Sequence, residues 1–341
     1  MPIDMACPMS RFNKRITFKN QVVYLIALLA CLGFLLSVTQ ILGESPDYSN
    51  YDEFFDLVRS EGLDALTASR FEPGFSILTF LLINLFATNA VVYGWIVVAA
   101  MLLKGLAISL YSSSQKAFFV VAIFYFARYF PLHELTQLRA ACAIALILVG
   151  AIVLWEGNFL IGTLICASAL LFHMSAAAVI PALFLPSSKR WQVMFIAFVT
   201  FVLTFTFSGV LTGYLGDLIP IVDVYQTGGF GADKPNPFAI QLVIDWIMIA
   251  VSFIMWDKLS LLMKRIVLLE IIGMAIFYGG IDFAVIAHRI REFYSVFWVL
   301  FVADGLRQNY TRWLNYSFIF VCVIFYSYVF IFSETFFSFN I

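Results

Sequence analysis

Apolar runs about as long as a membrane-spanning helix alternate with short polar breaks along nearly the whole chain. The runs lack the period-two alternation of a half-buried strand, and open sheet edges are not tolerated in lipid. We therefore expect an all-α polytopic membrane protein. The runs cover residues 22–42, 74–88, 90–110, 117–131, 137–155, 159–172, 174–186, 191–211, 238–256, 264–283, 291–305 and 313–333.

The first run follows a basic segment and is long enough to be a complete span. A cleaved signal peptide would have a shorter apolar core and a small-residue cleavage site. We interpret residues 22–42 as a retained first helix, with residues 1–21 in the cytoplasm.

Positive charge in short loops predicts the rest of the topology, because cytoplasmic loops are enriched in Lys and Arg. Basic residues at 104–116, 189–190, 258–265 and 307–312 mark cytoplasmic loops. The longer breaks at 43–73 and 212–237 are then external.

The charges of the later loops agree with this topology only if the short run 74–88 does not cross the membrane. The sequence leaves open whether it crosses. We expect a re-entrant or interfacial helix there, entered through Glu72-Pro73-Gly74, since Pro is tolerated in a first turn. The chain is then one membrane domain, 1–341, with about eleven spans of bilayer length.

Composition supports this interpretation, because 62% of residues are hydrophobic, only 12% are charged and the mean hydropathy is +0.95. A soluble chain of this size could not bury so much apolar surface. The basic residues form no nucleic-acid-binding face. The sequence has no metal-ligand spacing, nucleotide-binding loop or serine nucleophile motif, so we expect no cofactor and no metal.

The basic residues predicted on the external side are nearly all arginine, which orientation alone does not explain. Arginine offers a planar fork of donors that suits phosphate and carboxylate. Alternatively, these side chains pair with Asp52, Asp56, Glu61 or lipid headgroups. The set comprises Arg59, Arg70, Arg128, Arg139, Lys234, Arg289 and Arg291.

All three histidines also fall on the predicted external side. His173 interrupts an apolar stretch and must face the bundle interior or a wet cavity, where it could move protons or serve as a hydrogen-bonded structural residue. His133 and His288 lie in predicted loops and suit structural roles.

Two carboxylates stand at predicted external helix ends. Glu72 could cap the re-entrant helix or act as a general base at the rim of a cavity. Asp282 could form an ion pair near Arg289 and Arg291 or take part in catalysis. Asp245 and Glu270 are isolated within apolar runs, and we assign them no chemistry.

Five short patterns then occur in order: Asp47-Tyr48 with Tyr51 and Phe54, Glu72-Pro73-Gly74-Phe75, Leu138-Arg139-Ala140-Ala141, Phe172-His173-Met174-Ser175-Ala176, and Arg289-Ile290-Arg291-Glu292-Phe293-Tyr294. Together they resemble the EpsG-like branch of the Wzy polysaccharide polymerases over residues 40–305. The family usually has Gln at the position of Ala140, and often an aromatic residue at that of Met174.

The resemblance implies a GT-C-like bundle that joins oligosaccharide repeats carried on undecaprenyl diphosphate, at the outer face of the inner membrane. A chain-length regulator protein would be its partner. Arg139, Arg289 and Arg291 would then stabilise the diphosphate leaving group, and Glu72 or His173 would accept a proton, with Glu72 preferred. The residues expected to contact substrate are Asp47, Tyr51, Arg70, Arg128, Asp282 and Tyr294.

Three other functions stay open at this point. A lipid-linked oligosaccharide flippase is less favoured because the chain shows no pair of related halves with matching broken helices. A membrane O-acyltransferase of surface glycans would need histidine and basic residues on the inner side as well. A ligase that transfers finished glycan would share the site logic of a polymerase.

Overall fold

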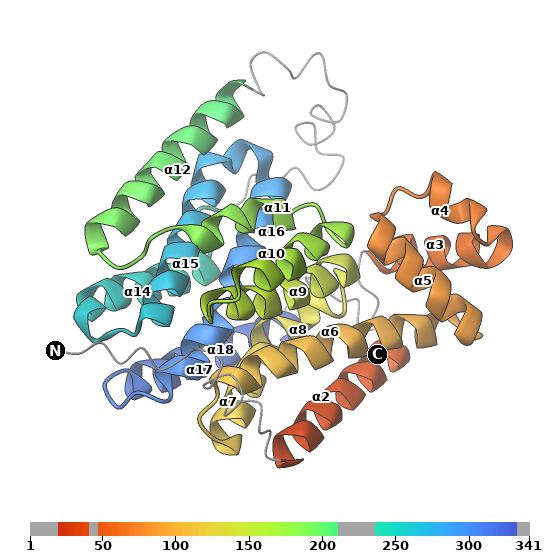
Figure 1. Ribbon diagram of the computed structural model, residues 1–341, viewed down its shortest axis with the longest axis horizontal. Coiled ribbons are helices and arrows are strands. Elements are labelled where there is room, and N and C mark those ends of the chain that lie inside the picture. The colour runs from red at the N-terminus through yellow and green to blue at the C-terminus, as the bar shows by residue number, and fades with distance from the viewer. Residues whose placement is uncertain (1–19, 41–46, 211–235, 333–341) are drawn as a thin grey trace. The chain divides into compact units, whose positions relative to one another are not determined.

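The computed structural model describes residues 20–40, 47–210 and 236–332 (Figure 1). The described residues are 82% helix and contain no strand, as the sequence predicts. The chain divides into two compact units: unit 1 is Met1–Ala176 with Asn315–Ile341, and unit 2 is Ala177–Leu314.

Five helices are long and apolar enough to cross a membrane: Val22–Thr39, Asn89–Tyr111, Leu138–Trp155, Arg190–Val210 and Arg312–Phe330. Three shorter apolar helical segments cover Pro73–Leu85, Phe159–Leu171 and Ile240–Ile254. The chain is therefore a multi-pass membrane protein, and the count of eleven spans stays a prediction. The predicted external loop 212–237 and the N-terminal segment 1–21 lie almost wholly outside the described residues.

In unit 1, α6 and α9 bury more residues than the other helices, and α2 packs along α6. α9 and α10 form a tight antiparallel pair, since a Cβ at Gly162 would lie 2.5 Å from the backbone nitrogen of Leu154. Small residues allow such close approach in membranes. The elements are α2 (Asn20–Thr39), α3 (Tyr48–Glu61), α4 (Asp64–Ala68), α5 (Pro73–Leu85), α6 (Asn89–Tyr111), α7 (Gln115–Arg128), α8 (Phe130–His133), α9 (Leu138–Trp155), α10 (Phe159–Ser168), η1 (Ala169–Leu171) and most of α18 (Arg312–Phe332).

In unit 2, α15 is the central helix, and α12, α14, α16 and α17 all pack against it. The elements are α11 (Ala176–Val179), η2 (Pro181–Phe184), α12 (Arg190–Val210), α14 (Ile240–Ile254), η4 (Trp256–Lys258), α15 (Leu261–Gly279), η5 (Ile281–Phe283), α16 (Ala284–Ser295) and α17 (Trp298–Gly305). All residues of α17 are buried, so its apolar character serves the protein core rather than lipid.

Two predicted continuous runs are broken. Residues 174–186 form only α11 and the short 3-10 helix η2, because Pro181 lacks the amide hydrogen that a continued helix needs. Residues 291–305 are divided between α16 and α17. Apolar composition alone does not reveal such breaks.

Lys104 does not mark a cytoplasmic loop, as its charge suggested. It lies within α6, is 1% exposed and forms an ion pair with Glu134. His133 is likewise no exposed loop residue, since it ends α8 fully buried, with its ring stacked 5.7 Å from that of Tyr129. A buried charge is tolerated where a partner neutralises it.

Candidate functional site

Glu72 precedes α5 and links three segments of unit 1. Pro73 starts the helix, and the Glu72 side chain makes no capping hydrogen bond to it. Its Oε2 instead accepts a hydrogen bond from Nη1 of Arg139 at 2.7 Å, across 67 residues of sequence. The role of Glu72 therefore extends beyond the helix end that it opens.

The other carboxylate oxygen of Glu72 faces the chain after η1. Its Oε1 lies 3.4 Å from Nδ1 of His173 and accepts a hydrogen bond from the Met174 amide at 3.3 Å. The His173 and Glu72 side chains are 13% and 12% exposed. One carboxylate thus joins an arginine and a histidine that the sequence marked separately.

Gly74 permits this approach. A Cβ at Gly74 would lie 2.7 Å from Cβ and 2.8 Å from the carbonyl oxygen of Leu171. Atoms that close must move apart, so the first turn of α5 meets η1 only because residue 74 has no side chain.

Arg139 enters the site from the first turn of α9. Its guanidinium carbon lies 4.7 Å from the centre of the Phe71 ring, and the Phe71 ring stacks on that of Tyr51 at 5.8 Å. Among the described residues, the buried Nε of Arg139 has no hydrogen-bond partner. The cluster therefore offers a fixed cation, with its side chain 22% exposed, beside aromatic rings.

Electrostatics keep Glu72 ionised. Burial alone would raise its pKa, but the hydrogen bond with His173 and the charge and hydrogen bond of Arg139 outweigh burial and lower the pKa to about 2. Burial raises the pKa of the Tyr51 hydroxyl, against the opposing charge of Arg139, so that hydroxyl stays protonated. A carboxylate with so low a pKa orients its neighbours well but has little affinity for a proton.

In unit 2, Arg291 is buried and forms an ion pair with Asp245, and its Nε lies 3.4 Å from Sδ of Met274. Asp245, which sequence reasoning left without a role, is this arginine's counter-ion. Arg289 is partly exposed and has no ion pair within the described part of the chain. Of the two, Arg289 is better placed to meet a ligand.

The remaining predicted residues are dispersed. Arg70 is exposed and donates to Oδ1 of Asn50 at 2.7 Å, and Asp47 directly precedes α3. Asp282 is exposed in η5. Tyr294 is buried, and its hydroxyl donates to the Ala178 carbonyl at 2.5 Å.

Arg128 is 2% exposed, and four aromatic rings surround its guanidinium. The ring centres of Phe124, Tyr129, Phe318 and Tyr326 lie 5.2–6.0 Å from its guanidinium carbon. This cage ties α7 to α18 and leaves little access for substrate.

A polar cluster that sequence reasoning missed lies within unit 1. Lys104 pairs with Glu134, and the Tyr125 hydroxyl donates to Glu134 at 2.6 Å. All three side chains are buried. The signal was a lysine inside an apolar run, which in a membrane protein requires a partner.

The fold and site describe a multi-pass membrane protein with a charged cluster at the start of its apolar helices. The chain matches the EpsG family over residues 11–341 and belongs to it. No curated protein and no solved structure gives a significant match. The family is associated with polysaccharide polymerisation, which assigns the chain to polysaccharide biosynthesis and implies a lipid-linked glycan substrate.

Proposed function

We propose that this protein is a polysaccharide polymerase that joins oligosaccharide repeats carried on undecaprenyl diphosphate. The reaction takes place at the outer face of the inner membrane, and a chain-length regulator is the protein partner. The observation that carries the proposal is the cluster of Glu72, Arg139 and His173 in unit 1.

Each group has a role in glycosyl transfer from a lipid diphosphate. His173 accepts the proton of the attacking sugar hydroxyl, whose oxygen bonds to the anomeric carbon of the growing chain. The bond from that carbon to the diphosphate oxygen breaks, and the electron pair leaves with the diphosphate. A guanidinium stabilises the negative charge that develops there.

The choice of His173 as the base follows from Glu72. A general base works best when its pKa lies near the working pH, and the pKa of Glu72 is about 2. Because Nδ1 of His173 faces Glu72, the carboxylate orients the ring and stabilises the imidazolium as it forms. We therefore assign Glu72 to positioning, although the sequence favoured it as the base.

Arg139 supplies the charge for the diphosphate. Its Nη1 is bound to Glu72, and the side chain is 22% exposed, so part of the arginine stays accessible to a phosphate. The role that the sequence suggested for Arg289 stays a prediction. Arg291 is already neutralised by Asp245 and supports its surroundings.

The test is His173→Ala in the native host, with surface polysaccharide separated on a gel and membrane protein levels checked. Met174→Ala is the matched control, because its side chain is 64% exposed and its backbone amide still binds Glu72. We expect His173→Ala to abolish the long-chain ladder and leave a single repeat, with an intact ladder in the control.

Two results would contradict the proposal. An intact ladder in His173→Ala would remove the assigned base. Loss of all surface glycan, including the single repeat, would mean that repeats no longer cross the membrane and would favour a flippase.

A further inference from the structure

Tyr93 of α6 supports the side chain of Arg139 from within unit 1. Tyr93 is 2% exposed, so it is too deeply buried to meet a substrate. Its ring meets that of Tyr51 edge-on at 6.2 Å, and the Tyr51 ring stacks on that of Phe71 at 5.8 Å. The guanidinium carbon of Arg139 lies 4.7 Å from the centre of the Phe71 ring. The aromatic rings of Tyr51 and Phe71 therefore connect Tyr93 to the guanidinium.

The hydroxyl of Tyr93 holds the backbone that leads into α9. It donates a hydrogen bond to the Leu135 carbonyl at 2.8 Å, across 42 residues of sequence. Leu135 lies in the connection between α8 and α9, so its buried carbonyl needs a partner from elsewhere in the chain. Arg139 follows in the first turn of α9. The hydroxyl therefore fixes the start of the helix that carries Arg139.

A second contact from α6 holds the same connection. Glu134, the residue before Leu135, is bound by Lys104 and by the Tyr125 hydroxyl. Lys104 and Tyr93 lie about three turns apart on α6, so they project from one face of that helix. These two side chains bind adjacent residues of the connection and leave it little freedom to shift.

We propose that Tyr93 is a positioning residue for Arg139, because it holds both the backbone before α9 and the aromatic stack beside the guanidinium. This inference rests on the proposed function, in which Arg139 stabilises the leaving diphosphate. Such stabilisation depends on where the charge lies, and a displacement of about 1 Å can cost about a hundredfold in rate. Tyr93 touches no reacting atom, so its effect on the reaction passes through Arg139.

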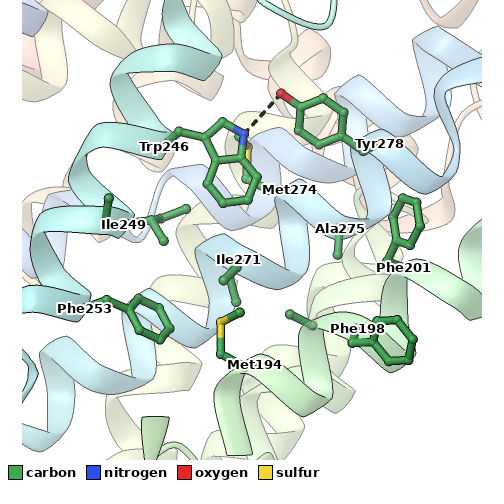
Figure 2. A pocket seen from close by; sticks show the side chains of 12 residues that line it. Met194, Phe198, Phe201, Trp246, Ile249, Phe253, Ile271, Met274, Ala275 and Tyr278 are labelled. Atoms are coloured by element: carbon green, nitrogen blue, oxygen red, sulfur yellow. Dashed lines mark hydrogen bonds between the residues drawn. The ribbon is translucent and has the colours of Figure 1, made fainter. Parts of the chain in front are cut away.

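A pair of tyrosine variants tests the hydroxyl alone. Tyr93→Phe keeps the ring that packs on Tyr51 and removes the hydrogen bond to the backbone. Tyr278→Phe is the matched control in unit 2, where Tyr278 lines an apolar pocket (Figure 2). The Tyr278 hydroxyl donates to the Pro237 carbonyl at 2.7 Å and accepts from Nε1 of Trp246 at 3.1 Å, and Figure 2 shows the second of these bonds. The control therefore also removes a hydroxyl that binds a backbone carbonyl.

The kinetic measurement is a double-mutant cycle on polymerisation by the purified full chain in liposomes, with an oligosaccharide repeat on undecaprenyl diphosphate as substrate. We expect Tyr93→Phe to lower kcat by about tenfold, the scale of one hydrogen bond, with little change in KM. In an Arg139→Lys background, which has no guanidinium to position, the same substitution should change kcat by less than about twofold. Tyr278→Phe should leave kcat unchanged in both backgrounds.

A second measurement needs no turnover. Phenylglyoxal reacts with guanidinium groups, and its reaction with the 22% exposed Arg139 is followed by mass spectrometry in liposomes without substrate. We expect Tyr93→Phe to raise the rate of Arg139 modification several-fold, because the guanidinium leaves the aromatic stack more often. Tyr278→Phe should react at the wild-type rate.

Equal kcat in Tyr93→Phe and wild type would overturn the inference and leave the polymerase standing. An equal loss of kcat from Tyr93→Phe in both backgrounds, or an unchanged rate of Arg139 modification, would also overturn it, because Tyr93 would then act by another route. Absence of polymer in the wild type would refute the proposed function. The rate of Arg139 modification would in that case decide whether Tyr93 positions Arg139.

Discussion

Replacing Glu72 with Gln removes the charge that joins Arg139 to His173 in unit 1. The substitution keeps the size of the side chain and leaves the arginine without its counter-ion. The substitution lowers the free energy of unfolding most at pH values where Glu72 is ionised in the folded protein.

The magnitude follows from the pKa. Lowering the pKa of Glu72 from 4.5 to about 2 corresponds to roughly 3 kcal/mol, at about 1.4 kcal/mol for each pKa unit. The side chain is only 12% exposed, so solvent screening removes little of this. Because the pKa is depressed on folding, the stabilisation is complete above about pH 4.5 and is lost as the pH falls towards 2. At about pH 3, proton linkage leaves roughly 1.4 kcal/mol of the contribution of Glu72 to the free energy of unfolding.

The assay is unfolding in detergent micelles between neutral pH and pH 3, comparing wild type with Glu72→Gln. We expect a stability difference of about 3 kcal/mol at neutral pH that falls by more than half at pH 3. Glu61→Gln, an exposed carboxylate of α3, is the control and should show little difference at either pH. A difference for Glu72→Gln that does not change with pH would refute the ion-pair reasoning.

Three further substitutions test other contacts, each with its own measurement. Arg128→Lys should lower the free energy of unfolding in micelles by about 1–2 kcal/mol, because an ammonium cannot stack on the rings of the cage; an unchanged unfolding midpoint would contradict this. Lys104→Met should cost about 3–5 kcal/mol in the same unfolding assay, because it leaves Glu134 buried without its cation. Adding Glu134→Met should recover most of that loss, and equal losses in the single and double variants would contradict the role of the ion pair. Gly74→Ala should abolish the polysaccharide ladder by forcing α5 away from Leu171, whereas Gly209→Ala, with open space around the new methyl group, should preserve it; a full ladder in both would remove Gly74 from the site.

The sequence singled out the residues of the candidate cluster but not their arrangement. Glu72 and Arg139 were singled out as charged groups at apolar helix ends, and His173 as a titratable group that interrupts an apolar stretch. Their contact depends on how α5, α9 and the segment after η1 pack, across 67 and 102 residues of sequence. No local pattern encodes that distance, so the sequence offered Glu72 as a cap or a general base and did not reveal its ion pair with Arg139.

Charge in the apolar runs was harder to interpret. The positive-inside rule counts every lysine alike, and so it assigned Lys104 to a loop. The ion pair with Glu134, 30 residues later, makes the buried position tolerable. Asp245 was given no role because its partner, Arg291, lies on another helix and is 46 residues away in the sequence.

The sequence also failed to predict that the run 291–305 is divided between α16 and α17. An apolar composition does not distinguish a helix buried in protein, such as α17, from one that faces lipid. The helical class of the chain was predictable because the apolar runs are long and carry no strand period.

The most direct measurement uses the purified full chain in liposomes with a synthetic oligosaccharide repeat on undecaprenyl diphosphate. Wild type should give products that differ in mass by one repeat and should release one undecaprenyl diphosphate for each new glycosidic bond. His173→Ala should bind the lipid-linked repeat and form no such products. Translocation of the repeat without any product longer than one unit in the wild type would contradict the assignment as a polymerase.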